Sequence, residues 1–246
     1  MKKTIGIIGG MGPLATADLF QKIVLHTQAS CDQDHLRVLI DGNTNIPDRT
    51  AALLYNGADP VPELVSSARG LERQGAEILV MPCNTAHNFY NAVQEAVSVP
   101  VLDMIRLTVQ ALSEQGIKKA GLIATDGTIQ TGIYQRTFLG TGVELLTPEE
   151  EGQRAVMDMI YKGVKAGRQD YDAYAARRTM ESLMKQGAET LILGCTELPL
   201  AVVLYRLEFP VTDPTMELAL GAIRAAGGEP VHRHGHTVQA NELEKD

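Results

Sequence analysis

Short apolar runs rich in β-branched residues alternate with longer amphipathic stretches along most of the chain. The runs predict strands at Thr4–Ile8, Leu36–Ile40, Glu77–Met81, Val99–Leu102, Ala120–Ala124, Val143–Leu146 and Thr190–Leu193. Stretches with one apolar face at the 3.6-residue period predict helices at Ala15–Thr27, Glu63–Arg73, Met104–Glu114 and Glu149–Val164. Strands that alternate with helices of this length form βαβ units and parallel sheets, so the pattern predicts an α/β fold.

A ten-residue segment occurs twice, 112 residues apart. Residues 74–83 read QGAEILVMPC and residues 186–195 read QGAETLILGC, with six of the ten positions identical. A weaker match joins residues 100–103 (PVLD) to residues 210–213 (PVTD). We therefore expect two similar α/β units that begin near residues 1 and 116 and face each other across a pseudo-twofold axis, with the active site between them.

Composition excludes several classes of function. The chain has 246 residues, of which 44% are hydrophobic, and 22 Lys and Arg stand against 30 Asp and Glu for a net charge of -8. This balance argues against nucleic-acid binding, and no apolar run reaches the roughly 18 residues of a membrane span. Gly9 and Gly10 interrupt the N-terminal apolar run too early for a signal peptide, so we expect a cytoplasmic protein.

The repeat places one cysteine, Cys83 or Cys195, directly after a strand and before a sequence that starts a helix. Ligands of open α/β sheets bind beyond the carboxyl ends of the strands. We expect residues 84–85 and 196–197 to open helices, whose N-terminal field lowers the pKa of a thiol. Two thiols on opposite sides of one carbon suit inversion: one removes a proton and the other returns a proton to the opposite face. The alternative is that both cysteines are small buried apolar residues.

Further segments around these cysteines resemble the aspartate/glutamate racemase superfamily. The paired cysteine signatures are residues 81–87 (MPCNTAH) and 194–197 (GCTE), and residues 5–13, 46–50 and 163–167 resemble the aspartate racemase branch. The resemblance implies that Cys83 and Cys195 are the catalytic bases, with Cys195 serving the L-face. It also implies a homodimer that uses neither pyridoxal phosphate nor a metal ion.

The resemblance further implies that a C-terminal helix around Met216–Ala226 returns to the first unit. We therefore expect a first domain of residues 1–103 with about 213–228, a second domain of 104–212, and a polar tail from 229 to 246. Glutamate racemases carry a histidine where this chain has Glu197, and an Asp-Ser pair where it has residues 9–11 (GGM). Both departures favour aspartate, a small acidic amino acid, as the substrate.

An acidic amino acid requires cationic partners for its carboxylates, and arginine binds a carboxylate with two parallel hydrogen bonds. By resemblance, Arg49 and Lys165 match the cationic substrate-binding positions; the alternative roles are a solvated loop residue and a helix-end cation. The other residues that we expect to hold the substrate are Met11, Asn84, Thr85, Thr125, Thr128, Thr196 and Glu197. The alternative for Asn84, Thr85 and Thr196 is ordinary helix capping.

Other functions remain open at this point. Residues 10–15 fit G-x-G-x-x-A after a first strand, with Asp41 ending the second, which imitates a dinucleotide-binding fingerprint. Another possibility is a racemase of glutamate or a broader set of amino acids, a hydantoin racemase or a maleate isomerase. A protein that binds acidic amino acids without catalysis is a more distant alternative.

Three further features have simpler explanations than catalysis. His87 follows Cys83 by one helical turn, where a core or capping role is at least as expected. Cys31 has no counterpart in the repeat. Residues 232–236 (HRHGH) could hold a metal ion, but we expect a tail without function and no metal site.

Overall fold

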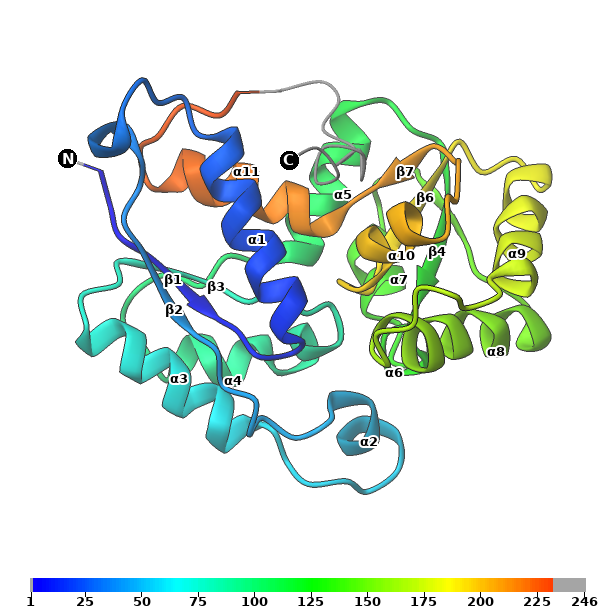
Figure 1. Ribbon diagram of the computed structural model, residues 1–246, viewed down its shortest axis with the longest axis horizontal. Coiled ribbons are helices and arrows are strands. Elements are labelled where there is room, and N and C mark those ends of the chain that lie inside the picture. Colours follow the sequence, from blue (N-terminus) through cyan, green and yellow to red (C-terminus); the bar gives the residue numbers. More distant parts are fainter. Residues whose placement is uncertain (1, 232–246) are drawn as a thin grey trace, which may run out of the picture.

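The computed structural model describes residues 2–231 and contains two sheets whose paired strands all run parallel (Figure 1). The first sheet has the order β2-β1-β3 and the second the order β5-β4-β6-β7. The strands are β1 (Ile5–Ile8), β2 (Val38–Asp41), β3 (Ile78–Val80), β4 (Lys119–Ala124), β5 (Glu144–Leu146), β6 (Thr190–Gly194) and β7 (Val211–Thr212). The predicted α/β fold is confirmed.

Helices cover both faces of each sheet, which explains why the central strands β1 and β4 are almost entirely buried. The α-helices are α1 (Pro13–His26), α2 (Arg49–Leu54), α3 (Val61–Arg73), α4 (Tyr90–Glu95), α5 (Met104–Glu114), α6 (Asp126–Gln130), α7 (Ile133–Phe138), α8 (Glu150–Asp158), α9 (Tyr174–Lys185), α10 (Leu198–Leu204) and α11 (Pro214–Ala225). Two 3₁₀ segments, η1 (Asp32–Asp34) and η2 (Thr85–Phe89), and one π-helical segment, η3 (Met159–Val164), complete the described chain.

The sequence repeat corresponds to a structural repeat. Gly75 and Gly187 follow equivalent helices with the same φ of 96°, a left-handed conformation that suits glycine. The glutamate two residues after each glycine accepts a backbone N–H at the start of the central strand, from Thr4 and Lys119 respectively, each at 3.0 Å. Equivalent glutamates therefore hold the start of the central strand in each of the two sheets.

The predicted strand Val99–Leu102 is wrong in extent, because the structure forms only a single parallel bridge between Leu79 and Val101. Side chains satisfy the neighbouring backbone instead: the Gln94 amide oxygen accepts the N–H of Val101 at 2.8 Å, and Glu72 accepts that of Ser98 at 2.7 Å. The segment nevertheless occupies the position that β7 holds in the second sheet.

The predicted helix Glu149–Val164 is also divided, since regular α-helix ends at Asp158 and the wider π-helical turn η3 follows. Within this turn a Cβ on Gly163 would lie 2.8 Å from the Tyr205 hydroxyl, so only glycine allows Tyr205 to pack there. Such turns are common at functional sites. This one positions Tyr161 and Lys165, as described below.

The C-terminal helix α11 returns to pack on α1 and α5 (Figure 1). Met104 of α5 belongs to the apolar core on the α1 and α11 side of the first sheet, whereas Ile105 and Val109 belong to a core of the second. Helix α5 therefore lies between the two halves. The residue limits given above for the two domains stay a prediction.

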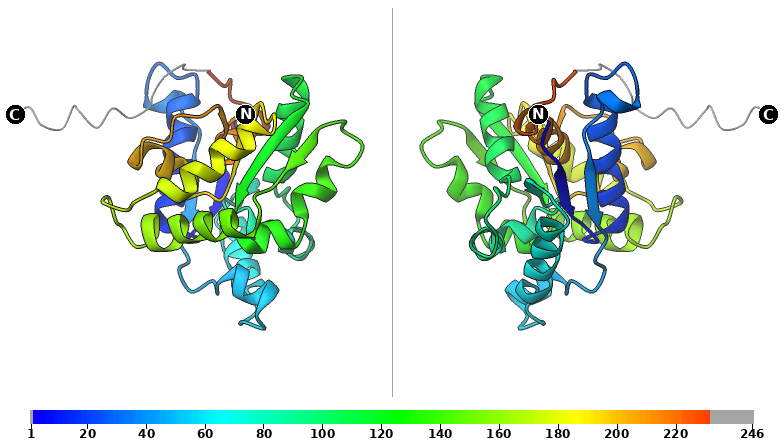
Figure 2. Two further views of the ribbon diagram at one scale, coloured as in Figure 1. Left: turned by 90° about the vertical axis from the view of Figure 1, so that its right-hand side faces the viewer. Right: turned by 90° about the vertical axis from the view of Figure 1, so that its left-hand side faces the viewer.

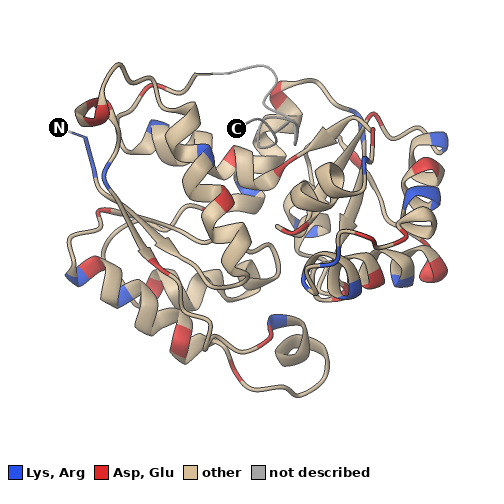
Figure 3. Cartoon of the chain, viewed as in Figure 1, with Lys and Arg blue, Asp and Glu red and all other residues tan. Residues whose placement is uncertain are grey.

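Charged residues of both signs alternate along the outer helices α8 and α9 (Figure 3). Among the described residues, no helix has the length and apolar character needed to cross a bilayer. The histidines of residues 232–236 lie outside the described residues.

The close packing of each central strand yields a prediction. A Cβ on Gly6 or Gly121 would lie 2.7 Å from a Leu79 or Leu191 methyl group, respectively. We expect Gly6→Ala and Gly121→Ala each to lower the free energy of unfolding by about 1–3 kcal/mol, because the core must shift to admit the methyl group. Urea denaturation measures this change. Gly42→Ala, at a site with no atom within 4 Å of the added Cβ, is the matched control, and equal loss in all three would contradict the packing argument.

Candidate active site

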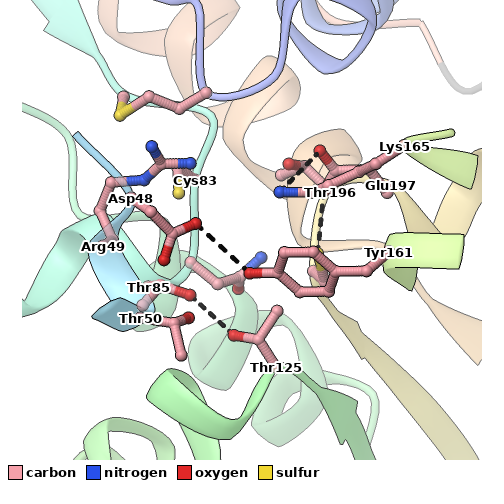
Figure 4. A pocket seen from close by; sticks show the side chains of 13 residues that line it. Asp48, Arg49, Thr50, Cys83, Thr85, Thr125, Tyr161, Lys165, Thr196 and Glu197 are labelled. Carbon is pink, nitrogen blue, oxygen red and sulfur yellow. Dashed lines mark hydrogen bonds and ion pairs between the residues drawn. The ribbon is translucent and has the colours of Figure 1, made fainter. Parts of the chain in front are cut away.

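One small cavity lies between the carboxyl ends of the two sheets and brings together most of the predicted site residues (Figure 4). Its empty space is about 290 Å³ including its opening to solvent, which limits the site to a small ligand. Its walls are formed by Met11, Asp48, Arg49, Thr50, Cys83, Asn84, Thr85, Thr125, Tyr161, Lys165, Cys195, Thr196 and Glu197. Segments from both halves of the molecule thus contribute.

Each repeat contributes one buried cysteine to the cavity, with exposed fractions of 6% for Cys83 and 7% for Cys195. The backbone of Cys83 is fixed by His87, whose Nδ1–H donates to the Cys83 carbonyl at 2.8 Å. The other ring nitrogen accepts the N–H of Met104 at 3.0 Å, and burial lowers the pKa of His87, which keeps the ring neutral. His87 does not line the cavity, so its role is to support Cys83.

The Cys195 thiol donates a hydrogen bond to the Glu197 carboxylate, with 2.9 Å between Sγ and Oε2. Burial is the main reason that the pKa of Cys195 lies well above its usual value; the Glu197 charge adds to the rise, and Lys165 opposes it. The expectation of a lowered pKa is therefore wrong for Cys195. Removal from water and a neighbouring carboxylate outweigh the field of the short helix α10.

Three further contacts continue from Glu197 across the cavity (Figure 4). Lys165 Nζ lies 3.7 Å from Glu197 Oε1 and 4.7 Å from the centre of the Tyr161 ring, while the Tyr161 hydroxyl donates to Asp48 Oδ2 at 3.4 Å. Burial lowers the pKa of Lys165, but the neighbouring groups, Glu197 first among them, more than compensate, so its pKa is raised and the ammonium stays charged. These contacts connect the two halves.

Arg49 stands on the opposite wall at the start of α2. The Asp48 side chain caps this helix by accepting the N–H of Ala51 at 2.7 Å. Arg49 is 9% exposed, and its guanidinium donates to the Pro47 carbonyl at 2.9 Å, but its buried Nε has no protein partner. Burial lowers the pKa of Arg49, yet the neighbouring Cys83 and Asp48 raise it overall, so a permanent cation lies beside the first cysteine.

Helix α2 reaches the second half because residue 127 is glycine. A Cβ there would lie 2.8 Å from the Thr50 hydroxyl, so α2 contacts α6 without a side chain between them. Both side views show the α2 segment projecting below the first sheet (Figure 2). The contact holds Arg49 over the cavity.

The threonines behind Cys83 form a closed set of hydrogen bonds. Thr85 lies 2.9 Å from Thr125 and 3.0 Å from Thr128, and the last two are 3.2 Å apart. Thr128 is fully buried and, contrary to our expectation, does not line the cavity. Its hydroxyl instead orients the two threonines that do.

Asn84 has a free donor at the cavity wall. Its carbonyl oxygen accepts the Tyr134 hydroxyl at 2.7 Å, whereas its buried Nδ2 has no protein partner. The prediction that Asn84 or Thr85 caps a helix is not met, since neither side chain makes such a bond at the start of η2. An amide held in this way is placed to donate to a bound carboxylate.

The glycines after β1 lie close to other segments of the protein. A Cβ on Gly10 would lie 2.3 Å from the Asn43 carbonyl oxygen, and one on Gly9 would lie 2.4 Å from Thr16. Only Gly12 faces the cavity wall, where a Cβ would lie 3.1 Å from Glu197 Oε1. These glycines mainly allow neighbouring segments of the protein to pack closely.

Three wall residues, Asp48, Thr50 and Tyr161, were not predicted from the sequence. The first two flank Arg49 in the sequence, so their position next to a predicted cation could have identified them as wall residues. Tyr161 lies inside a predicted helix with a π-helical turn that periodicity does not reveal.

Comparisons with known proteins agree with this arrangement. The family model described as Asp/Glu/Hydantoin racemase matches residues 8–220. A broad specificity amino-acid racemase of Bacillus subtilis is 30% identical over 89% of this chain and 96% of its own. The structure of an aspartate racemase from Picrophilus torridus is 33% identical, with a TM-score of 0.80 over 93% of this chain and 96% of that one.

A further structure, an aspartate racemase homologue from Pyrococcus horikoshii, is 26% identical, with a TM-score of 0.73 over 92% of this chain and 100% of that one. The family match covers most of the chain, and its two halves carry the paired cysteines in one cavity. The chain belongs to the Asp/Glu/hydantoin racemase family.

Proposed function

We propose that this protein interconverts L- and D-aspartate by transferring protons at Cα between Cys83 and Cys195, without a cofactor or metal ion. The observation that carries the proposal is the pair of repeat-related, buried cysteines in one cavity that also holds Arg49 and Lys165. We further propose that the working form is a homodimer and that its ligand is a small acidic amino acid.

The proton balance of the reaction is complete within the two thiols. One cysteine, as the thiolate, takes the Cα proton, and the opposite thiol then donates a proton to the carbanion. The first sulfur ends as a thiol and the second as a thiolate, so the charge has moved across the cavity. Cys195, held as a thiol by Glu197, is the proton donor when Cys83 is the base. When the roles reverse, Cys195 as the thiolate takes the Cα proton and the Cys83 thiol returns one from the opposite face.

The polar groups of the wall divide naturally between the substrate's charges. The Asn84 amide and the hydroxyl of Thr85 or Thr196 face the α-carboxylate, where negative charge develops in the carbanion. The unpartnered edge of Arg49 and the ammonium of Lys165 hold the side-chain carboxylate. Glu197 and Asp48 are available to the substrate ammonium.

The two-base mechanism predicts that neither cysteine is dispensable. We expect Cys83→Ala and Cys195→Ala each to lower racemisation of aspartate by at least about 10²–10⁴-fold, the usual contribution of an acid–base group. Chiral chromatography of L-aspartate incubated in D₂O measures both inversion and deuterium uptake at Cα. Cys31→Ala, which removes an exposed cysteine, is the control. Full activity in either single variant would exclude the mechanism.

The Cys195–Glu197 contact predicts the form of the pH profile. Inversion requires one proton on the cysteine pair, so kcat/KM falls at high pH when that last proton is lost. Because the pKa of Cys195 is raised, we expect this fall only above the ordinary thiol pKa of about 8.5.

Glu197→Gln removes a negative charge that disfavours the thiolate, and therefore moves the fall in kcat/KM to lower pH. The pH dependence of kcat/KM for aspartate, measured from about pH 6 to about 10.5, tests this shift. Glu144→Gln changes an exposed carboxylate in the second sheet and serves as the control. An unshifted or upward-shifted fall in the Glu197 variant would contradict the assigned contact.

The role of Arg49 predicts a defect in substrate binding. We expect Arg49→Ala to lower kcat/KM for L-aspartate about tenfold to hundredfold, the value of a charge-assisted hydrogen bond, while Arg49→Lys retains part of it. Steady-state kinetics measure the loss, and thermal melting checks that the variant folds. Arg154→Ala, on the outer face of α8, is the matched control. Unchanged kinetics in Arg49→Ala would remove Arg49 from the substrate site.

A further inference from the structure

A second hollow, which we call the annex, adjoins the catalytic cavity. Its volume is about 1050 Å³ including its open mouth, against about 290 Å³ for the catalytic cavity. The two hollows share a boundary formed by Met11, Asp48, Arg49, Tyr161, Lys165 and Glu197. A substrate group that passes this boundary leaves the polar cavity and enters the annex.

The outer wall of the annex is largely apolar. It includes Leu14 at the start of α1, Ile46 ahead of α2, Val164 at the end of η3 and Leu200 on α10, so that both halves contribute. Ile46 and Val164 also belong to the apolar cores and are therefore held in place. Leu14, by contrast, is 66% exposed. Exposed apolar side chains beside a polar site are typical of surfaces that bind apolar ligand groups.

The boundary carries no net formal charge. Arg49 and Lys165 contribute two positive charges, and Asp48 and Glu197 contribute two negative charges. Lys165 is already partnered by Glu197 at 3.7 Å, and Arg49 lies beside Asp48 and Cys83. A boundary made only for anionic side chains would carry a positive excess, whereas this one places no electrostatic penalty on an uncharged side chain.

We propose that the annex receives the side chains of uncharged, unbranched amino acids such as norleucine and methionine. The same two thiols then invert these amino acids as well as aspartate, so the inference rests on the two-thiol reaction proposed above. With Cα between the sulfurs and the α-carboxylate toward Asn84, the side chain extends between Arg49 and Lys165 to the apolar wall. The proton balance is unchanged, because one thiolate takes the Cα proton and the other thiol returns one.

A homologous series of substrates tests the annex directly. Deuterium uptake at Cα in D₂O is measured for L-alanine, L-2-aminobutyrate, L-norvaline and L-norleucine with the intact protein. Burying a methylene favours binding by up to about fourfold, so kcat/KM rises at each step if the side chain enters the annex. A value that stays level or falls along the series overturns the assignment.

Variants of the annex wall locate the effect. We expect Leu14→Ala to lower kcat/KM for norleucine about fourfold to tenfold and to leave the value for aspartate unchanged, because only the longer side chain reaches residue 14. Leu139, which is 78% exposed at the end of α7 and lines neither hollow, gives the control Leu139→Ala. A loss of equal size for norleucine and aspartate in Leu14→Ala also overturns the assignment.

Aspartate measured in the same preparation separates the two proposals. If aspartate exchanges its Cα proton but kcat/KM stays level or falls from alanine to norleucine, only the proposal for the annex is overturned. A rising series without aspartate exchange supports the annex and overturns aspartate as the substrate. Exchange with none of these amino acids overturns both proposals.

Discussion

The contact between α2 and α6 determines whether this molecule has one site or two unrelated sheet edges. A single missing side chain, at Gly127, lets Thr50 approach the second half closely. The residues just before Thr50 are Asp48, which caps α2, and Arg49, whose guanidinium covers Cys83. If α2 stood farther from α6, the cavity would lose its first cation and the partner of the Tyr161 hydroxyl together.

The same contact makes the environments of the two cysteines unequal, although the repeat makes their backbones similar. Cys83 lies beside a buried arginine, whereas Cys195 donates to a carboxylate. Burial and the neighbouring carboxylate both favour the protonated thiol at Cys195, whose pKa is raised. In the proposed reaction the two thiols therefore start from different electrostatic surroundings.

Charge balance also explains how so many ionisable groups share a small space. Lys165 is stabilised by Glu197, and Arg49 by Asp48, so that neither cation is buried alone. The π-helical turn η3 supplies Tyr161 between them, and its ring covers the Lys165 ammonium. Because these charges have partners within the protein, burying them in the empty site costs less desolvation free energy. A ligand that enters replaces some of these partners.

Local pattern in the sequence determined the elements and the chemistry of the repeat. Short apolar runs identify β1 and β4, which are buried on both faces, and the 3.6-residue period identifies α5, which has one buried face. The duplicated segment ending in Cys83 and Cys195 by itself indicates two thiols at equivalent sheet edges. Family resemblance then added Arg49 and Lys165, which the structure places in the same cavity.

Tertiary structure alone decided how those residues behave. The thiol state of Cys195 depends on burial and on the carboxylate of Glu197, neither of which a helix-start motif specifies. Thr128 was expected at the wall but lies behind it, because distance along a helix does not fix depth within a fold. Tyr161 reaches the cavity through a wider helical turn, and that turn packs on the distant Tyr205 through Gly163. Sequence patterns report one element at a time, whereas a pKa, a cavity wall and a charge balance are set by elements that meet only after folding.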